Sequence, residues 1–176
     1  MSVEEWVKAA KENDETAFFR LMELHREQAY RIAFAYLRNE QEALDAVQET
    51  TFRAYRQLAK LKEPQYFTTW LIRILLNYCH DQAKKRRRWH PFSRIESEQA
   101  VAARPIDREA KIDIDIAMNR LKPKYKQVVI LKYFEDLTVA EVARVIGRPE
   151  GTVKTRLHQA LSQLRVLLGK EEEHDV

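Results

Sequence analysis

Apolar residues recur every three or four positions along most of this chain, first from Glu4 to Arg88 and again from Ile112 to Leu168. This spacing places them on one face of an α-helix, because a helix completes a turn every 3.6 residues. Helix-breaking residues are rare, since the 176 residues include only three glycines and five prolines. The sequence therefore predicts an all-α protein without a sheet.

Three helices are expected in the first stretch. Asp14 and Asn39 can each cap a helix, because their side chains accept hydrogen bonds from the first backbone amides. Pro64 then interrupts the chain, since the residue before a proline avoids helical backbone, and a third helix begins near Tyr66. The predicted buried faces are Phe18, Leu21, Leu24, Ala29, Ile32, Ala33 and Tyr36; then Ala43, Ala46, Val47, Thr50 and Tyr55; then Trp70, Leu71, Ile74, Leu75 and Tyr78.

The helical pattern fades between residues 89 and 108, where Pro91 and Pro105 lie among mixed polar residues. Such a stretch is typical of a linker. We therefore predict two small helical domains joined by a flexible linker. The predicted boundaries are 1–88 for the first domain, 89–110 for the linker, 111–170 for the second domain and 171–176 for an acidic tail.

The second domain carries the pattern of a helix-turn-helix. Thr138 and Glu141 have the spacing of a capping box that opens a short helix. Gly147 suits a turn with positive φ, and Pro149 suits the start of the next helix. The two helices are expected to bury Val139, Val142, Ala143 and Ile146, and then Val153, Leu157, Ala160, Leu161 and Leu164.

The other side of that last helix is rich in hydroxyl, amide and basic groups. Such groups near a helix N-terminus can contact base edges and phosphates in a DNA major groove. The alternative is an ordinary helical hairpin with a solvated face, and RNA is a less suitable ligand because its major groove is deep and narrow. The residues concerned are Glu150, Thr152, Lys154, Thr155, Arg156, His158 and Gln159.

The first domain combines aromatic residues with an unbroken basic run from Lys84 to Arg88. The net charge of +4 is small, so the clustering of the cations says more than their excess. Aromatic faces beside cations can hold single-stranded nucleic acid. The alternatives are a solvated helix end for the basic run and a core position for Trp70; Phe67 fits either environment.

Other classes of protein find little support. Cys79 is the only cysteine, so an internal disulfide and a Cys-x-x-Cys zinc site are excluded. The five histidines have no metal-ligand spacing, no carboxylates pair on one helix face, and no Gly-rich phosphate loop occurs. No signal peptide or stretch of roughly 20 apolar residues is found. We expect a cytoplasmic protein that is not an enzyme, with no catalytic residues, metal, cofactor or small-molecule substrate.

Three segments together resemble the extracytoplasmic-function (ECF) sigma factors, the smallest members of the sigma-70 family. Ala43 to Glu49, with Phe52 and Tyr55, resembles the segment that binds RNA polymerase. Phe67 to Ile74, followed by Asn77 and Asp81, resembles the promoter-melting segment. The C-terminal domain of the family is matched by Leu121 to Val129, Leu137 to Ile146 and Pro149 to Leu157. One such segment would be weak evidence for the resemblance, but three segments in the same order are highly specific for this family.

The resemblance implies promoter-specific transcription initiation in response to envelope or extracytoplasmic stress. The implied partners are core RNA polymerase, promoter DNA and an anti-sigma factor. Asp45, Gln48 and Glu49 would contact the polymerase. Phe67 and Asn77 would hold a flipped base of the minus-ten element, beside phosphate contacts from Arg73, Lys84, Lys85 and Arg86. The minus-thirty-five element would be read by Thr152, Lys154, Thr155, Arg156 and His158.

A stand-alone helix-turn-helix regulator is the main alternative. It accounts for the second domain but not for the aromatic and basic residues of the first. A regulator of this kind usually dimerises to reach two DNA half-sites.

Overall fold

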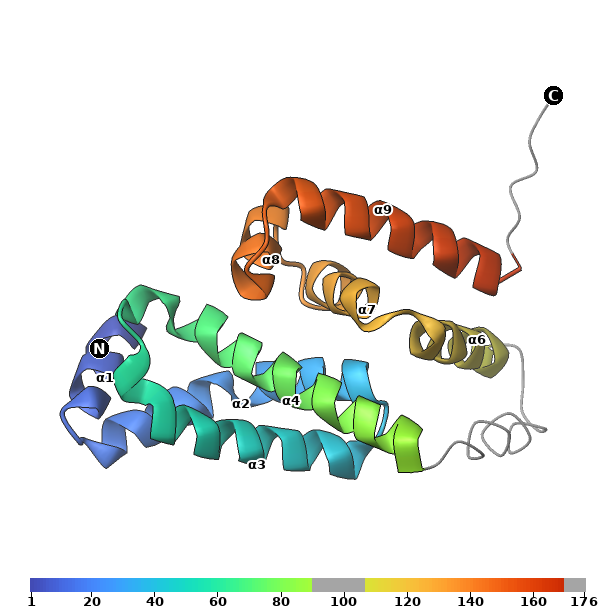
Figure 1. The fold of residues 1–176 in the computed structure, drawn as a ribbon. Helices are drawn as coiled ribbons and strands as arrows, with labels where there is room; N and C mark the ends of the chain where they lie inside the picture. Colours follow the sequence, from blue (N-terminus) through green and yellow to red (C-terminus); the bar gives the residue numbers. More distant parts are fainter. Residues whose placement is uncertain (90–106, 170–176) are drawn as a thin grey trace.

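The computed structural model of the chain describes residues 1–89 and 107–169, with side chains of the second stretch described from Ile114 onward. All regular elements within these ranges are helices or helical turns, as predicted (Figure 1). Most of the predicted linker, and the acidic tail, lie outside the described residues. No helix in the described part is both long and apolar enough to cross a membrane.

Four helices and two short 3-10 turns form the first block. Asp14 accepts a hydrogen bond from the amide of Ala17 at 3.0 Å, and Asn39 accepts one from Glu42 at 2.9 Å, which confirms both predicted caps. The break at Pro64 is also confirmed, because a short turn precedes the last helix. The elements are α1 (Val3–Lys11), α2 (Glu15–Leu37), α3 (Glu40–Gln57), η1 (Leu58–Lys60), η2 (Pro64–Tyr66) and α4 (Phe67–Trp89).

Two positions of the predicted core are wrong. Leu24 is 66% exposed, whereas its neighbour His25 lies buried one helical turn after Leu21. On α3, Tyr55 is 55% exposed and Ala54 is buried in its place. The other predicted positions on these two helices are buried or half-buried, so only these two positions shift to a neighbouring residue.

The second block contains four helices and a π-helical turn: α6 (Asp107–Arg120), α7 (Pro123–Val129), η3 (Ile130–Phe134), α8 (Val139–Ile146) and α9 (Glu150–Leu167). Helix α6 begins at Asp107, four residues before the predicted domain boundary. The buried set differs slightly from the prediction. Val145 is buried, whereas Val139, Ile146, Leu161 and Leu164 are half-buried.

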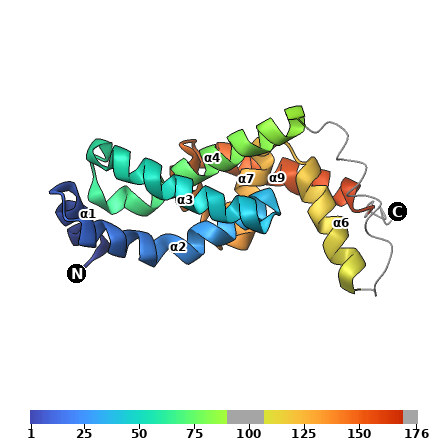
Figure 2. The same cartoon turned by 90° about the horizontal axis from the view of Figure 1, so that it is seen from below.

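The two blocks pack against each other. Helix α4 packs against α8, and the π-helical turn η3 packs against α2. Figures 1 and 2 show the second block against one side of the first. A single hydrophobic cluster includes Ile32 and Leu75 of the first block together with Val128 and Val142 of the second. The two blocks therefore share an apolar contact, which the sequence pattern did not indicate.

Candidate nucleic-acid interface

The joint between α8 and α9 has the predicted helix-turn-helix features. Thr138 and Glu141 form a reciprocal capping box, with hydrogen bonds of 3.2 and 2.7 Å, and the backbone amide of Thr138 lowers the pKa of the Glu141 carboxyl. Gly147 ends α8 at a φ of 66°, a conformation that glycine adopts without strain. Val153 is fully buried at the angle between the helices. Pro149 precedes α9 by one residue and so occupies its N-cap position.

The first half of α9 carries its polar side chains away from this joint. Lys154, Thr155 and His158 are exposed, and Thr152 and Arg156 are half-buried. Val153 and Leu157 of the same helix are buried. Three of the five residues predicted to read DNA are therefore exposed, and the other two lie at the edge of the buried face. Hydrogen-bond donors of this kind can contact base edges in a major groove.

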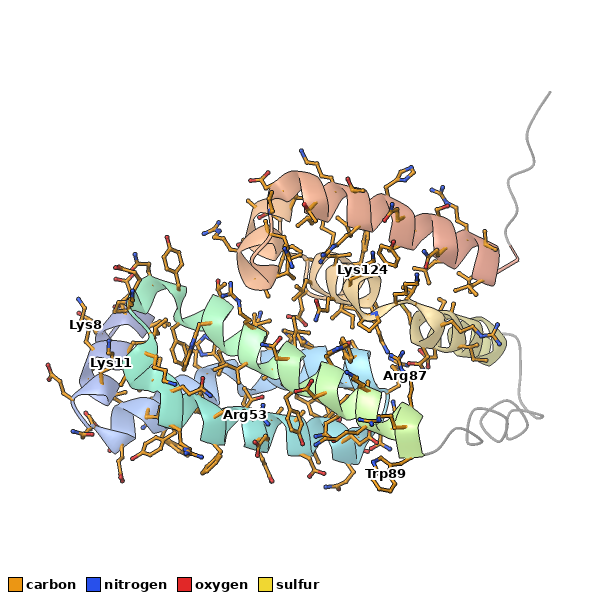
Figure 3. All side chains as sticks on the ribbon, in the orientation of Figure 1. Lys8, Lys11, Arg53, Arg87, Trp89 and Lys124 are labelled. Carbon is orange, nitrogen blue, oxygen red and sulfur yellow. The ribbon has the colours of Figure 1, made fainter. Side chains whose placement is uncertain are left out.

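Helix α4 carries the second candidate surface. Asn77, Lys84 and Lys85 are exposed on it, and Arg87 and Trp89 lie near its carboxyl end (Figure 3). The ammonium groups of this surface are available for contacts with phosphate oxygens.

Two of the predicted phosphate-binding arginines are bound within the protein. Arg73 donates from Nε to the carbonyl of Val145 at 2.9 Å, and from Nη2 to the carbonyl of Arg144 at 2.7 Å. Arg86 donates to Glu42 at 3.0 Å and to the carbonyl of Leu37 at 3.1 Å. These two guanidinium groups therefore have to exchange protein partners before they can bind DNA through the same atoms.

Phe67 differs most from its predicted position, because its ring has no exposed surface. It packs edge-on against His25, with ring centroids 5.3 Å apart, and against Trp70 at 5.8 Å. In this conformation the ring is inaccessible to a flipped base, so the structure does not agree with the predicted direct base contact. The ring instead packs in the core beneath the exposed residues of α4.

His25 is a residue of this region that the sequence reasoning missed. Its Nδ1 lies 2.8 Å from the carbonyl of Leu21 and its Nε2 lies 2.8 Å from the hydroxyl of Thr68. Burial lowers the pKa of His25, which favours the neutral ring. Since a carbonyl only accepts, Nδ1–H donates to Leu21 and Nε2 accepts from Thr68. The only signal in the sequence is a polar residue one helical turn after Leu21.

Helix α3 presents a third surface of mixed character. Asp45 and Gln48 are exposed, and the half-buried Glu49 pairs with Arg53 at 2.7 Å. Beside them, the aromatic side chains of Phe52 and Tyr55 are each 55% exposed. Large exposed apolar side chains next to charges are typical of a surface that binds another protein.

Cys79 lies fully buried on α4, and burial raises the pKa of its thiol to about 12. The thiolate needed for redox chemistry is therefore scarce at neutral pH. Among the described residues, no group of three or more histidine, cysteine or acidic side chains has the geometry to hold a metal ion.

Comparison with known proteins places both blocks in one family. Residues 21–89 match sigma-70 region 2, and residues 112–164 match sigma-70 region 4. The chain is 32% identical to RNA polymerase sigma factor SigV of Bacillus subtilis, over 84% of this chain and 89% of the relative. It is 28% identical to the ECF RNA polymerase sigma factor SigW of the same organism, over 94% and 96% of the two chains.

The fold is also similar to a solved structure, that of the sigma factor RpoE in complex with the anti-sigma factor NepR from Bartonella quintana. The TM-score is 0.64 at 24% identity, over 88% of this chain and 98% of RpoE. The two family matches follow the two helical blocks, and the relatives are matched over most of their length. This chain therefore belongs to the ECF group of the sigma-70 family, the RNA polymerase sigma factors that direct promoter-specific transcription initiation.

Proposed function

We propose that this sigma factor recognises a promoter through two separate surfaces, one on each helical block. The face of α9 with Thr152, Lys154, Thr155, Arg156 and His158 reads the minus-thirty-five element. The surface of α4 with Arg73, Asn77, Lys84, Lys85 and Arg86 contacts the minus-ten element, supported from below by Phe67. The observation that carries this proposal is the exposure of Lys154, Thr155 and His158 on α9, directly after a helix-turn-helix joint closed by the buried Val153.

Core RNA polymerase binds the third surface in this proposal. Asp45, Gln48 and Glu49 supply charge and hydrogen-bonding groups, and the exposed Phe52 and Tyr55 supply apolar area. An interface of this composition needs aromatic anchors surrounded by polar groups. No catalytic group of this chain takes part, since the polymerase performs the chemistry, and the protein acts in the cytoplasm.

An anti-sigma factor is the proposed regulator, with envelope or extracytoplasmic stress as the signal. The structural similarity to RpoE, solved in complex with the anti-sigma factor NepR, supports this partner class. The anti-sigma factor would act by competing with core polymerase or promoter DNA for the surfaces described above.

The experiment compares Arg156→Ala with Lys84→Ala in transcription from a set of promoters that differ at the minus-thirty-five element. Arg156→Ala is expected to change the ranking of promoters, with losses of about 1–3 kcal/mol at those whose bases it contacts. Lys84→Ala is expected to weaken all promoters alike, because a phosphate contact carries no sequence information. Equal losses across all promoters from both variants would contradict the role of Arg156.

A stand-alone DNA-binding regulator, the alternative drawn from the sequence, accounts for the helix-turn-helix but not for the match of residues 21–89 to sigma-70 region 2. Such a protein would bind duplex DNA tightly and specifically as a dimer without polymerase. A sigma factor is expected to select its promoter only when it is bound to core polymerase.

A further inference from the structure

The start of α4 is held from α2 by a side-chain hydrogen bond. Nε2 of His25 lies 2.8 Å from the hydroxyl of Thr68, although the two residues are 43 positions apart. Thr68 is the second residue of α4, and the ring of Phe67, the first residue, packs edge-on against the same imidazole with ring centroids 5.3 Å apart. One side chain of α2 therefore contacts two successive residues in the first turn of α4.

The direction of this hydrogen bond follows from the surroundings of His25. The residue is 7% exposed, and burial lowers the pKa of its ring, which favours the neutral form. Its Nδ1 lies 2.8 Å from the carbonyl of Leu21, one helical turn earlier. Because a carbonyl only accepts, Nδ1 carries the hydrogen and Nε2 carries a lone pair. The hydroxyl of Thr68 therefore donates to Nε2, which sets the rotation of the Thr68 side chain.

Packing alone does not require an imidazole at this place. The neighbouring Leu21 and Phe67 belong to an apolar cluster, which an aliphatic side chain would extend. Burying a polar ring costs free energy unless hydrogen bonds replace those to water. Without the imidazole, the Thr68 hydroxyl could bond a backbone carbonyl of the preceding turn, as threonines in helices commonly do. The imidazole thus adds one specific feature, a directed link from α2 to Thr68.

The turn that this link holds lies where the promoter-melting segment begins. That segment runs from Phe67 to Ile74, and Tyr66, directly before it, is 45% exposed. The exposed Asn77 follows on the same helix. Side chains that select a base have to be held to within about 0.5 Å, which needs supporting hydrogen bonds from rigid elements. The 23-residue helix α2 is an element of this kind.

We propose that His25 is a positioning residue for the minus-ten element: through Thr68 it fixes the orientation of the first turn of α4, on which the choice of minus-ten bases depends. The buried ring does not touch DNA itself. The proposal rests on the proposed assignment of the minus-ten element to α4, whereas the link between α2 and α4 rests on contacts within the protein.

Two pairs of substitutions separate this link from simple packing. His25→Gln places an amide oxygen near the position of Nε2, where it can accept from Thr68, whereas His25→Asn keeps an amide group only near Nδ1, beside Leu21. Thr68→Ser keeps the hydroxyl, whereas Thr68→Val keeps the shape without it. The matched control is Thr50→Val on α3, because the hydroxyl of that buried threonine has no hydrogen-bond partner in the described part of the structure.

Each full-length variant is assayed with core polymerase on two libraries of promoter fragments, one randomised in the minus-ten element and one in the minus-thirty-five element. A barcode downstream of the start is transcribed and sequenced, which gives the preference for each base. Urea unfolding of each free variant measures whether it is folded under the assay conditions.

His25→Asn and Thr68→Val are expected to weaken the minus-ten base preference about tenfold, the equivalent of one lost hydrogen bond. Their preference at the minus-thirty-five element should stay within about twofold of that of the unmodified protein. His25→Gln, Thr68→Ser and the control Thr50→Val should stay within about threefold at both elements, because none of them removes the link.

A minus-ten preference that is unchanged in His25→Asn and Thr68→Val would overturn the positioning role. Equal losses at both elements, or a loss as large for His25→Gln as for His25→Asn, would also overturn it. A purely structural role lowers total transcription through lost stability and does not alter the preference at one element alone.

Asn77→Ala, assayed on the same libraries, separates this proposal from the previous one. If Asn77→Ala changes the minus-ten preference and the His25 variants do not, only the positioning role is wrong. If none of these variants changes it, the assignment of the minus-ten element to α4 is wrong as well.

Discussion

Lys126 is an ammonium group in largely apolar surroundings. Burial, followed by the nearby guanidinium groups of Arg86, Arg87 and Arg38, lowers its pKa to about 8, while the Cys79 thiol acts weakly in the opposite direction. Because an exposed lysine has a pKa near 10.5, the protonated form is destabilised in the folded protein. The folded state therefore binds fewer protons than the unfolded state between these two pH values.

Lys126→Met is predicted to raise the free energy of unfolding at pH 7 by up to about 3 kcal/mol, the equivalent of the lowered pKa. This advantage is fully present below pH 8 and shrinks as pH rises toward 10.5, because the lysine of the unmodified protein then becomes neutral in the folded state first. Urea unfolding of both proteins at pH 7, 8, 9 and 10 measures the difference. A difference in free energy of unfolding that stays constant from pH 7 to pH 10 would contradict the attribution to the buried charge of Lys126.

Substitutions at Phe67 distinguish a ring that only packs beneath the exposed residues of α4 from a ring that contacts DNA. Phe67→Ala is predicted to lower the free energy of unfolding by about 3–5 kcal/mol, and Phe67→Leu by less than about 1.5 kcal/mol. Since leucine fills most of the same space, that variant should retain most promoter-dependent transcription. A Phe67→Leu protein of normal stability that has lost minus-ten recognition would instead show a direct base contact.

At the scale of single elements, the features that the sequence predicts correctly are set by local chemistry. The caps at Asp14 and Asn39, the break at Pro64 and the capping box at Thr138 each depend on a few neighbouring residues. The buried faces were less predictable. Tertiary packing buries His25 in preference to the more apolar Leu24, because a neutral imidazole can satisfy both of its nitrogens there.

The turn between α8 and α9 allows a matched comparison of two glycines. Gly147→Ala is predicted to lower the free energy of unfolding by about 1–2 kcal/mol, because its φ of 66° is strained for any residue with a Cβ. Gly151→Ala should raise it by up to about 1 kcal/mol, because an added Cβ in that helix meets nothing within 4 Å. Chemical denaturation of both variants measures whether their free energies of unfolding change in opposite directions. An increase for Gly147→Ala would contradict the backbone strain argued for that position.

At the scale of the whole molecule, the sequence predicted two helical blocks but not the contact between them. Arg31 and Glu135 are 104 positions apart, and Arg73 and Val145 are 72 apart. Local periodicity carries no information about such pairs. The contacts between the blocks also explain why Arg73, which was expected at DNA, is bound within the protein. Val145, which was not among the residues predicted to be buried, is buried in α8.

The most direct test of the sigma-factor function is to mix the purified full-length protein with core RNA polymerase and a library of promoter fragments. Co-elution with the polymerase and the sequences of the transcript starts are then measured. A stable complex that starts transcripts at defined sites sharing two conserved elements is the predicted result. Failure to bind core polymerase, combined with specific duplex binding by the protein alone as a dimer, would contradict it and favour the stand-alone regulator.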